Sequence, residues 1–480
     1  MSVSRRDILK GSLAALGFSA LPGGVLFAAP KGWRPRGRPN LVLGAVSDTH
    51  IRTAWDGKSR YWRFPLKYFK AALEYFRAAK VDAVVHCGDF AHRGMVASMQ
   101  FHADTWREVF GKSGGPVKLF VSGNHDIEGW TYNNFGGGIF PDPAERRKYI
   151  LGEDTAAKWE DIWREKYEPV WHKEVKGYHF VGHHWGADGV AYPEIDMAKF
   201  LESHKDEPWI ASGTRPLFLV RHVAPLGKLA PALRKWRNAV TLFGHAHGSA
   251  ANWNMVRNHR GNAVIEIPSC EPRGTGGLAG TLPISKAKPE GAECAGTPRA
   301  GYVIRVYDDM LVVERREFGE GGSLGADWVM PLGENLPDSF SVEARMAYIG
   351  KPEFPKNAKL AVERVTKDSE SSSAPVSCIR VTIPNANGNP DSRVYAYEVV
   401  VVGADPKKKL FKCVFAAGVN MGIGHETNNG VTNLEIPGDQ AARRRCPRHR
   451  GASMFLARHE RQGHRRENQT IKVCATTAQQ

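Results

Sequence analysis

The fold of this chain is decided by residues 41–50, which read LVLGAVSDTH. The mostly apolar run Leu41–Ser47 has the length and composition of a buried β-strand, and polar residues follow it at once. Four similar runs occur further along the chain, and each is followed directly by His, or by Gly and then Asp, Asn or His. These runs are Ala83–Cys87, Val117–Ser122, Pro216–Arg221 and Ala239–Phe243.

Two helical patterns separate the first three of these runs. Pro65–Val81 and Ala97–Phe110 carry apolar residues at helical spacing. Alternating strands and helices at this spacing indicate βαβ units, so we expect an α/β protein with a largely parallel sheet.

The polar residues that follow the five strands include seven nitrogen and oxygen donors. In open α/β sheets, sites form outside the carboxyl ends of the strands, so these donors are expected at one edge. Seven such donors suit two divalent transition metals, whereas a single structural zinc more typically uses Cys pairs. The candidate ligands are Asp48, His50, Asp89, Asn124, His222, His245 and His247.

In order and type, these residues resemble the motifs of the calcineurin-like metallophosphoesterase superfamily: D-x-H, G-D, G-N-H-[DE], a single His and G-H-x-H. The resemblance covers about residues 40–250 and extends more loosely to about 318. It implies a four-layer α-β-β-α sandwich that holds two divalent ions of Mn, Fe or Zn.

The same resemblance divides the ligands between the two metals. One metal would be held by Asp48, His50, Asp89 and His247, and the other by Asp89, Asn124, His222 and His245. Asp89 would bridge the ions, with its two oxygens facing different metals.

The chemistry implied is attack of a metal-bound hydroxide on phosphorus. His125 is the candidate general acid for the leaving group, with Asp126 orienting its ring; contact of His125 with a phosphate oxygen is the alternative. Arg93 and Arg221 could clamp a phosphate, although ion pairs within the protein would explain both equally well.

The chain departs from the family at one informative position. Many members read G-D-x-x-D-R, and here residues 88–93 read GDFAHR, so His92 replaces the acid. This replacement weakens a comparison with Ser/Thr protein phosphatases. Purple acid phosphatases carry a Tyr three residues after the bridging Asp, and that position is also His92 here, which argues against a tyrosinate-ligated ferric ion. His183 and His184 are rivals for the single His, but His222 follows the cleaner apolar strand.

The rest of the chain is less informative about chemistry. We expect a phosphoesterase domain over 40–318 with an insertion at about 127–215, then a linker, and an all-β region at 338–437 of immunoglobulin-like sandwich type. Within these ranges we expect a surface loop at Glu271–Ala300, a hairpin at Gly301–Phe318, a linker at Gly319–Pro337, and strands at Ser377–Ile383, Val394–Val402, Leu410–Phe415 and Val431–Ile436.

The N-terminus resembles a twin-arginine export signal. Arg5 and Arg6 precede an apolar stretch, Leu13–Phe27, which ends at Ala28-Ala29-Pro30. We therefore expect a signal peptide at 1–29, a linker at 30–39, passage through the twin-arginine export machinery, and a periplasmic or extracellular mature protein without a stable membrane span. An uncleaved anchor is the alternative.

The net charge of +16 is concentrated at the two ends. Residues 1–38 hold seven Lys/Arg and one acid, and residues 438–480 hold ten Lys/Arg and three acids, which leaves +3 on residues 39–437. Nucleic-acid binding is therefore not expected of the folded body. The basic tail at 438–480 is expected to be disordered, or to follow a change of reading frame.

Composition excludes several other classes of protein. Hydrophobic residues make up 42% of the chain, which excludes global disorder, and seven Cys in 480 residues specify no disulfide framework. We expect an exported phosphohydrolase of phosphate mono- or diesters. The alternatives are a non-catalytic cell-surface binding protein that retains the metal site and, third, nucleic-acid binding through the tail.

Overall fold

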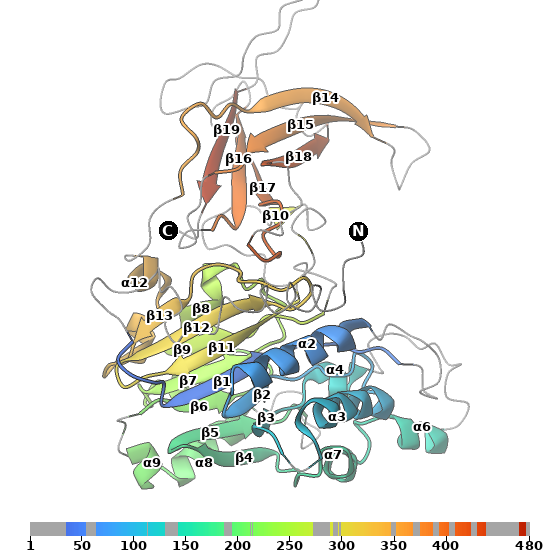
Figure 1. Cartoon of the computed structure of the whole chain (residues 1–480), viewed down its shortest axis with the longest axis vertical. Helices are drawn as coiled ribbons and strands as arrows, with labels where there is room; N and C mark the ends of the chain where they lie inside the picture. Colours follow the sequence, from blue (N-terminus) through green and yellow to red (C-terminus); the bar gives the residue numbers. More distant parts are fainter. Residues whose placement is uncertain are drawn as a thin grey trace, which may run out of the picture.

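The protein is described from a computed structural model (Figure 1). The predicted signal peptide and most of the basic tail lie outside the residues that the structure describes. Those residues are 35–53, 64–112, 114–129, 143–186, 194–211, 213, 215–271, 289–290, 296, 299–346, 352–367, 375–386, 393–402, 409–423, 430–437 and 470–476.

A six-stranded sheet contains the first three predicted strands. Its order is β13-β12-β11-β1-β2-β3, with β1, β2 and β3 parallel and the hairpin strands antiparallel. The strands are β1 (Leu41–Val46), β2 (Ala83–His86), β3 (Val117–Phe120), β11 (Ala300–Val306), β12 (Met310–Glu317) and β13 (Trp328–Pro331).

A second six-stranded sheet contains the other two predicted strands. Its order is β4-β5-β6-β7-β9-β8, parallel from β5 to β9 and antiparallel at both edges. The strands are β4 (Val170–Val175), β5 (Tyr178–His183), β6 (Leu217–Val220), β7 (Ala239–Phe243), β8 (Val256–His259) and β9 (Asn262–Glu266).

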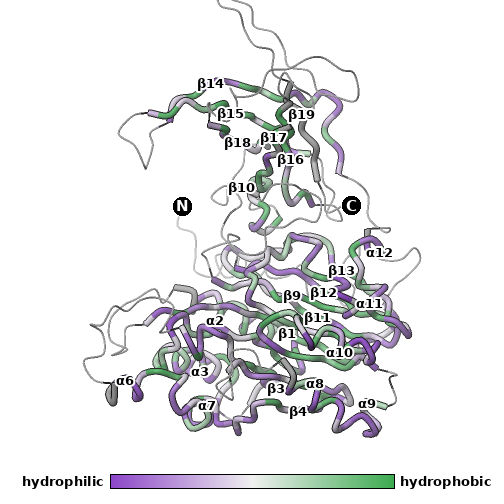
Figure 2. The backbone as a smooth tube through the Cα atoms, turned by 180° about the vertical axis from the view of Figure 1, so that it is seen from behind, coloured by the Kyte–Doolittle hydropathy of each residue, from purple (hydrophilic) through white to green (hydrophobic). Residues whose placement is uncertain are grey.

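Helices cover the outer faces of both sheets. On the first sheet, α2 (Phe64–Ala78) and α3 (Val96–Phe110) pack their apolar faces; Phe69, Leu73 and Phe76 are fully buried. On the second sheet lie α8 (Glu194–Ser203) and α10 (Leu229–Leu233). The facing sides of the two sheets share one hydrophobic core, and Figure 2 shows hydrophobic residues on the strands of both. The predicted four-layer α-β-β-α sandwich is confirmed.

Short elements complete this body. The helix α4 (Asn124–Ile127) follows β3 directly and carries part of the third motif. The remaining elements are α6 (Pro143–Tyr149), α7 (Thr155–Trp163), α9 (Pro208–Ala211), the 3-10 turn Trp253–Met255, α11 (Leu336–Ser339) and α12 (Val342–Met346).

Two parts of the expected organisation differ from the structure. The segment 127–215, expected as an insertion, supplies β4 and β5 of the second sheet. Gly319–Pro337, expected as a linker, contains β13, whose Trp328 and Met330 are fully buried in the core between the sheets. Both segments belong to the sandwich because their apolar side chains fill its core.

The C-terminal part is built from β-strands, as predicted. We use the name C-terminal β region for the described residues of 352–437 together with 470–476, which form β14–β19. One sheet has the order β14-β15-β18, and another has the order β10-β17-β16-β19, in which the short β10 (Pro289–Glu290) comes from the preceding loop. The remaining strands are β14 (Ala361–Lys367), β15 (Val376–Pro384), β16 (Ala396–Val402), β17 (Lys409–Phe415), β18 (Val431–Pro437) and β19 (Thr470–Thr476).

The strand β19 differs from the expectation of a disordered tail. Thr470–Thr476 pairs antiparallel with β16 along its whole length. Its alternation of apolar and polar residues, TIKVCAT, is short and lies after a basic stretch, which is why composition alone did not indicate it. Within the described part of the chain, no helix combines the length and apolarity that crossing a bilayer requires.

Truncation of Trp328 tests whether β13 is an integral part of the sandwich. We expect Trp328→Ala to lower the free energy of unfolding by about 3–5 kcal/mol, because it removes a fully buried aromatic side chain. Urea unfolding measures this, with Val117→Ala on β3, where the side chain is 38% exposed, as the control. A loss no larger than that of the control would mean that β13 contributes little to the core.

Candidate metal centre

The five predicted strand ends meet in one place. Asp48 and His50 follow β1, Asp89 follows β2 and Asn124 begins α4 after β3, while His222 follows β6 and the pair His245 and His247 follows β7. The first three ends belong to one sheet and the last two to the other, so the site lies where the carboxyl ends of the two sheets come together.

The donor atoms form two groups that share Asp89. In the first group, the Asp48, His50, Asp89 and His247 donor atoms all lie within 4.8 Å of one another. His50 Nε2 lies 2.9 Å from His247 Nε2 and 3.5 Å from Asp89 Oδ2. His247 Nε2 lies 3.4 Å from Asp48 Oδ1.

The second group joins Asp89, His222 and His245 within the same limit, and the Asn124 amide joins them. His222 Nε2 lies 2.8 Å from Asn124 Oδ1 and 3.2 Å from Asp89 Oδ2. His245 Nδ1 lies 3.1 Å from His222 Nε2 and 3.2 Å from Asn124 Oδ1. The structure thus brings together the seven predicted ligands, divided as the resemblance implies.

The chemistry of this donor set fits metal cations. His222 Nδ1 donates its proton to the carbonyl oxygen of Cys87 at 2.7 Å, so Nε2 carries the lone pair whenever the ring is neutral. Nε2 faces the oxygens of Asn124 and Asp89, which are acceptors. Acceptors that converge at this distance repel one another unless a proton or a metal cation lies between them, and imidazole, carboxylate and amide donors suit divalent transition metals.

The electrostatics of the cluster point the same way. Burial by itself lowers the pKa of His222, but the charge of Asp89 and a hydrogen bond to it outweigh burial and raise the pKa to about 9. Burial also raises the pKa of Asp48, but hydrogen bonds to His247 and His50 hold it well below its usual value. The two carboxylates are at most 1% exposed and yet ionised, so the cluster requires positive charge, from protons or from metals.

The backbone of the ligand loops is strained. Five of the seven ligands have left-handed φ angles, which non-glycine residues rarely adopt. Such conformations persist where the surrounding structure holds them, and they concentrate at functional sites. The angles are 50° at Asp48, 45° at His50, 59° at Asp89, 69° at His245 and 53° at His247.

Two glycines allow these loops to approach closely. A Cβ at Gly123 would collide with the Asp89 carboxylate, and a Cβ at Gly244 would collide with Ser47 and the Asp48 carboxylate. The G-N-H-D and G-H-x-H segments therefore need glycine at these positions, because the two carboxylates leave no room for a side chain.

The two oxygens of Asp89 have different surroundings. Oδ2 lies between the two groups, near both His50 and His222. Oδ1 accepts the backbone N–H of His125 at 2.8 Å. That the two oxygens face different metals stays a prediction.

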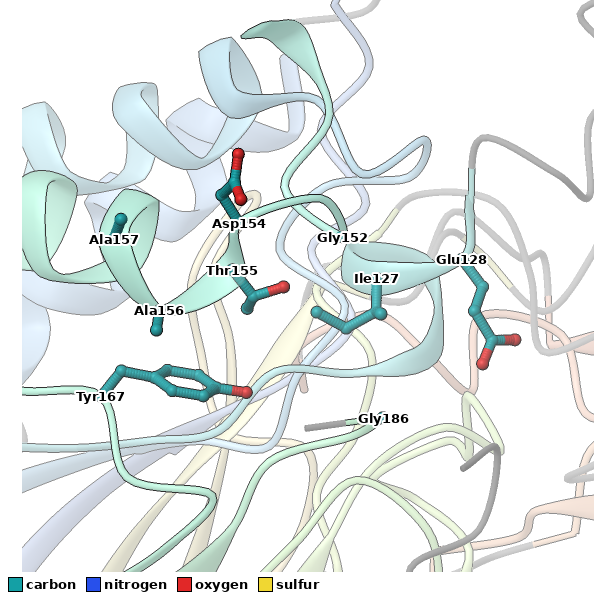
Figure 3. A pocket seen from close by; sticks show the side chains of 9 residues that line it. All are labelled: Ile127, Glu128, Gly152, Asp154, Thr155, Ala156, Ala157, Tyr167 and Gly186. Carbon is teal, nitrogen blue, oxygen red and sulfur yellow. The ribbon is translucent and has the colours of Figure 1, made fainter. Parts of the chain in front are cut away.

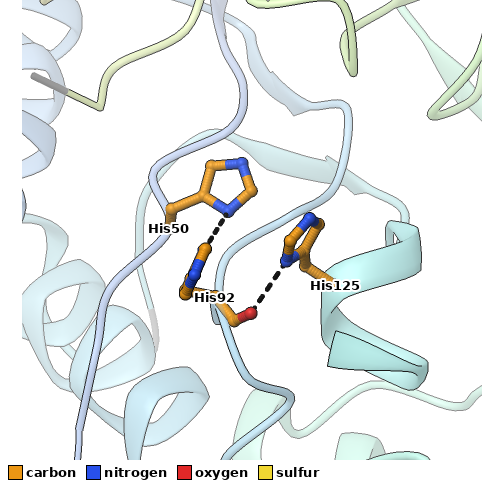
Figure 4. A group of neighbouring side chains, drawn as sticks. All are labelled: His50, His92 and His125. Carbon is orange, nitrogen blue, oxygen red and sulfur yellow. Dashed lines mark hydrogen bonds between the residues drawn. The ribbon is translucent and has the colours of Figure 1, made fainter. Parts of the chain in front are cut away.

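His125 lies beside His50, a member of the first group, as Figure 4 shows. Its Nδ1 donates to the carbonyl oxygen of His92 at 2.8 Å, and its ring lies 4.7 Å from that of His50. The side chain of His92 stacks on His125 at 4.9 Å, and its Nδ1 lies 3.2 Å from His50 Nδ1. In the sequence, His92 stood out only because it replaces the acidic residue of the family motif. Nothing in the motif indicated that its ring would contact both His50 and His125.

The expected role of Asp126 in orienting the ring of His125 is not what its contacts show. Its carboxylate accepts three backbone N–H groups, from Asp89 at 2.9 Å, Ala91 at 2.8 Å and Gly123 at 2.8 Å. The carbonyl of His92 is the hydrogen-bond acceptor for the ring. Asp126 therefore ties the loop after β2 to the loop after β3.

A hydrogen-bond chain that sequence reasoning missed anchors the loop after β1. His102 Nδ1 donates to the Ser98 carbonyl, so its Nε2 accepts the hydroxyl proton of Thr49 at 2.7 Å. His86 Nδ1 accepts the N–H of Gly88, and its Nε2 lies 3.4 Å from the Thr49 hydroxyl. Burial lowers the pKa of His102 to about 4, which keeps its ring neutral as this chain requires.

The remaining candidates lie outside the two groups. His184 Nδ1 accepts the N–H of Ser122, and the neighbouring His183 has its pKa lowered to about 4 by burial and by the charge of Arg221. Neither rival histidine belongs to a metal group of the described residues. A phosphate-clamping role for Arg93 or Arg221 stays a prediction.

A pocket of about 590 Å³ opens beside α4 (Figure 3). The carboxylate of Glu128 at this pocket accepts the indole N–H of Trp185 at 3.0 Å, and the ring of Trp185 lies 6.1 Å from that of His222. The pocket is therefore linked to the metal cluster through one aromatic side chain. Its lining residues are Ile127, Glu128, Gly152, Asp154, Thr155, Ala156, Ala157, Tyr167 and Gly186.

Comparison with protein families gives one match. Residues 41–249 match the model of the calcineurin-like phosphoesterase family, and all seven predicted ligands lie within the matched range. Comparison with curated proteins found no match.

Solved structures resemble the chain only distantly. A purple acid phosphatase, PPD1 from yellow lupin (Lupinus luteus) seeds, is 15% identical with a TM-score of 0.37 over 61% of this chain and 54% of that one. The chain thus spans about half the length of that enzyme. A dimetal phosphatase from Danio rerio is 13% identical, with a TM-score of 0.34 and coverages of 59% and 98%. GAP50, the anchor in the inner membrane complex of Plasmodium, is 12% identical, with a TM-score of 0.35 and coverages of 64% and 93%.

Substitution of Asp126 separates a structural from a catalytic role. We expect Asp126→Ala to lower the free energy of unfolding of the metal-free protein by about 3 kcal/mol, because three buried N–H groups lose their acceptor. Urea unfolding in the presence of a chelator measures this, and Asp104→Ala, which removes an exposed pair with Arg107, should change little. Unchanged stability with reduced turnover would instead support the original orienting role.

Proposed function

We propose that this chain, whose residues 41–249 form a calcineurin-like phosphoesterase domain, is an exported dimetal phosphohydrolase that cleaves phosphate mono- or diesters. The observation that carries the proposal is the pair of donor groups that share Asp89 Oδ2. Their ligands are Asp48, His50 and His247 on one side and Asn124, His222 and His245 on the other.

Two divalent cations of Mn, Fe or Zn bound to these groups would supply Lewis acidity and lower the pKa of a water molecule at the phosphorus. The protein contributes the geometry. Asp89 and the histidines of the two donor groups are largely buried and hold their donor atoms in a fixed arrangement. Electrostatic stabilisation of a transition state is strongest in such a site, from which water is excluded.

His125 is the residue proposed to protonate the leaving group. Because Nδ1 is held by the His92 carbonyl, the proton that can be donated resides on Nε2 of the imidazolium. The stacked ring of His92 and the edge of His50 fix the plane of the imidazole.

The general-acid role predicts a dependence on the leaving group. We expect His125→Ala to reduce kcat about 10²–10⁴-fold on phenyl phosphate and far less on p-nitrophenyl phosphate, because p-nitrophenolate leaves without a proton. Asp89→Asn should reduce turnover of both substrates together with metal content, because it removes the shared charge. Steady-state kinetics and elemental analysis give both quantities.

His179→Ala, at a half-exposed histidine on β5, is the matched control and should leave both activities unchanged. An equal loss on both aryl esters in His125→Ala would favour phosphate contact over proton donation. If the metal-loaded parent protein hydrolyses no mono- or diester and a chelator changes nothing, the non-catalytic binding alternative is favoured.

Export through the twin-arginine machinery is the second part of the proposal. It rests on Arg5 and Arg6 ahead of the apolar stretch Leu13–Phe27. A metal centre loaded before transport is a reason for exporting a protein already folded.

Conservative replacement of the arginine pair tests this. We expect Arg5→Lys with Arg6→Lys to retain the protein in the cytoplasm of a host with this pathway, as measured by cell fractionation and immunoblotting. Arg34→Lys with Arg36→Lys, which makes the same change downstream of the apolar stretch, should leave export intact. Equal export of both variants would refute the signal.

A further inference from the structure

The loop that follows β7 carries two ligands and has a strained backbone. His245 and His247 both adopt left-handed φ angles, 69° and 53°. The carboxylate of Asp48 accepts the N–H of His245, at 3.1 Å from Oδ1 and 3.0 Å from Oδ2, which fixes the first half of the loop. Left-handed conformations at two ligands persist only if the second half is held as well.

The second half of the loop is buried beneath the C-terminal β region. Ser249 is 1% exposed and Ala251 is 0% exposed. Ala251 belongs to a hydrophobic cluster whose other buried members come from the C-terminal β region or the segments that join its strands. These include Leu360, Val381, Ile383, Val394, Tyr395, Val399, Phe415, Val419 and Ile436.

One buried polar contact joins the two parts directly. The hydroxyl of Ser249 donates to Asn420 Oδ1 at 2.5 Å, and Asn420 Nδ2 donates to the carbonyl of Gly296 at 3.0 Å. The Ser249 oxygen also accepts the N–H of Ala251 at 3.2 Å. Asn420 is 3% exposed, so both ends of its amide are satisfied inside the protein and its orientation is fixed.

We propose that the C-terminal β region supports the metal centre, with Asn420 as a positioning residue that holds, through Ser249, the loop carrying His245 and His247. One residue, Gly248, separates His247 from Ser249, so a change in Ser249 displaces a ligand directly. Residues that orient metal ligands without touching the metal commonly change metal affinity 10–100-fold when replaced. The proposal uses the dimetal site only for this effect on affinity; the support of the loop can be measured without metal.

Hydrogen exchange of the full chain tests the support. We expect Asn420→Ala to accelerate amide exchange across residues 244–252 in metal-free protein and to weaken Mn²⁺ binding, measured by calorimetric titration, by about tenfold or more. The matched control is Asn433→Ala on β18. Asn433 Oδ1 also accepts a hydrogen bond from a hydroxyl, that of Thr382 at 2.8 Å, but this contact is exposed. That variant should leave both readouts at the parental level.

A double-mutant cycle shows whether the contact itself acts. Ser249→Ala alone should reproduce the effect of Asn420→Ala on exchange and on Mn²⁺ affinity, and the double variant should add little, because both remove one interaction. If Asn420→Ala and Ser249→Ala leave exchange at 244–252 and Mn²⁺ affinity within twofold of Asn433→Ala, the proposal is overturned. Failure to hydrolyse phosphate esters would count against the proposed function alone, since neither readout depends on turnover.

Discussion

The two-sheet body depends on two carboxylates that are buried out of contact with water. Asp48 and Asp89 lie at the carboxyl ends of neighbouring strands and are surrounded by His50, His222 and His247. Burying two negative charges is unfavourable unless positive charge accompanies them, so the cluster requires positive charge, from protonated histidines or from metals. That requirement also explains why the chain tolerates left-handed backbone at five ligands, since each such loop brings a donor to these charges.

Around the carboxylates, hydrogen bonds join the ligand loops to other elements of the protein. Asp126 links the loops after β2 and β3 through three backbone N–H groups. Thr49 connects the loop after β1 to α3 through His102. Ser249 connects the loop after β7 to the C-terminal β region. Four of the five ligand segments thus have a partner on another element, and such shared support keeps donor atoms within the small tolerances that metal binding and catalysis require.

Prediction from the sequence succeeded where the signal was local and failed where it depended on contacts. The strand β1 and the donors behind it follow from one apolar run and the residues next to it. The three backbone contacts of Asp126 were not predicted, because adjacency to His125 does not reveal which groups its carboxylate meets. The segment that forms β13 was predicted to be a linker, because a run as short as WVMP does not by itself indicate a strand. It forms one by pairing with β12 at the edge of the sheet.

The sequence alone determined the α/β architecture, the identity of the seven donors and their order along the chain, because periodicity and residue type are properties of each segment by itself. Only the tertiary structure decided that one oxygen of Asp89 lies between the two groups, that His92 holds both His50 and His125, and that Asn420 reaches Ser249 across 171 residues. These contacts join segments distant in the chain, and which atoms meet depends on how the sheets and loops pack, which no single stretch of sequence encodes.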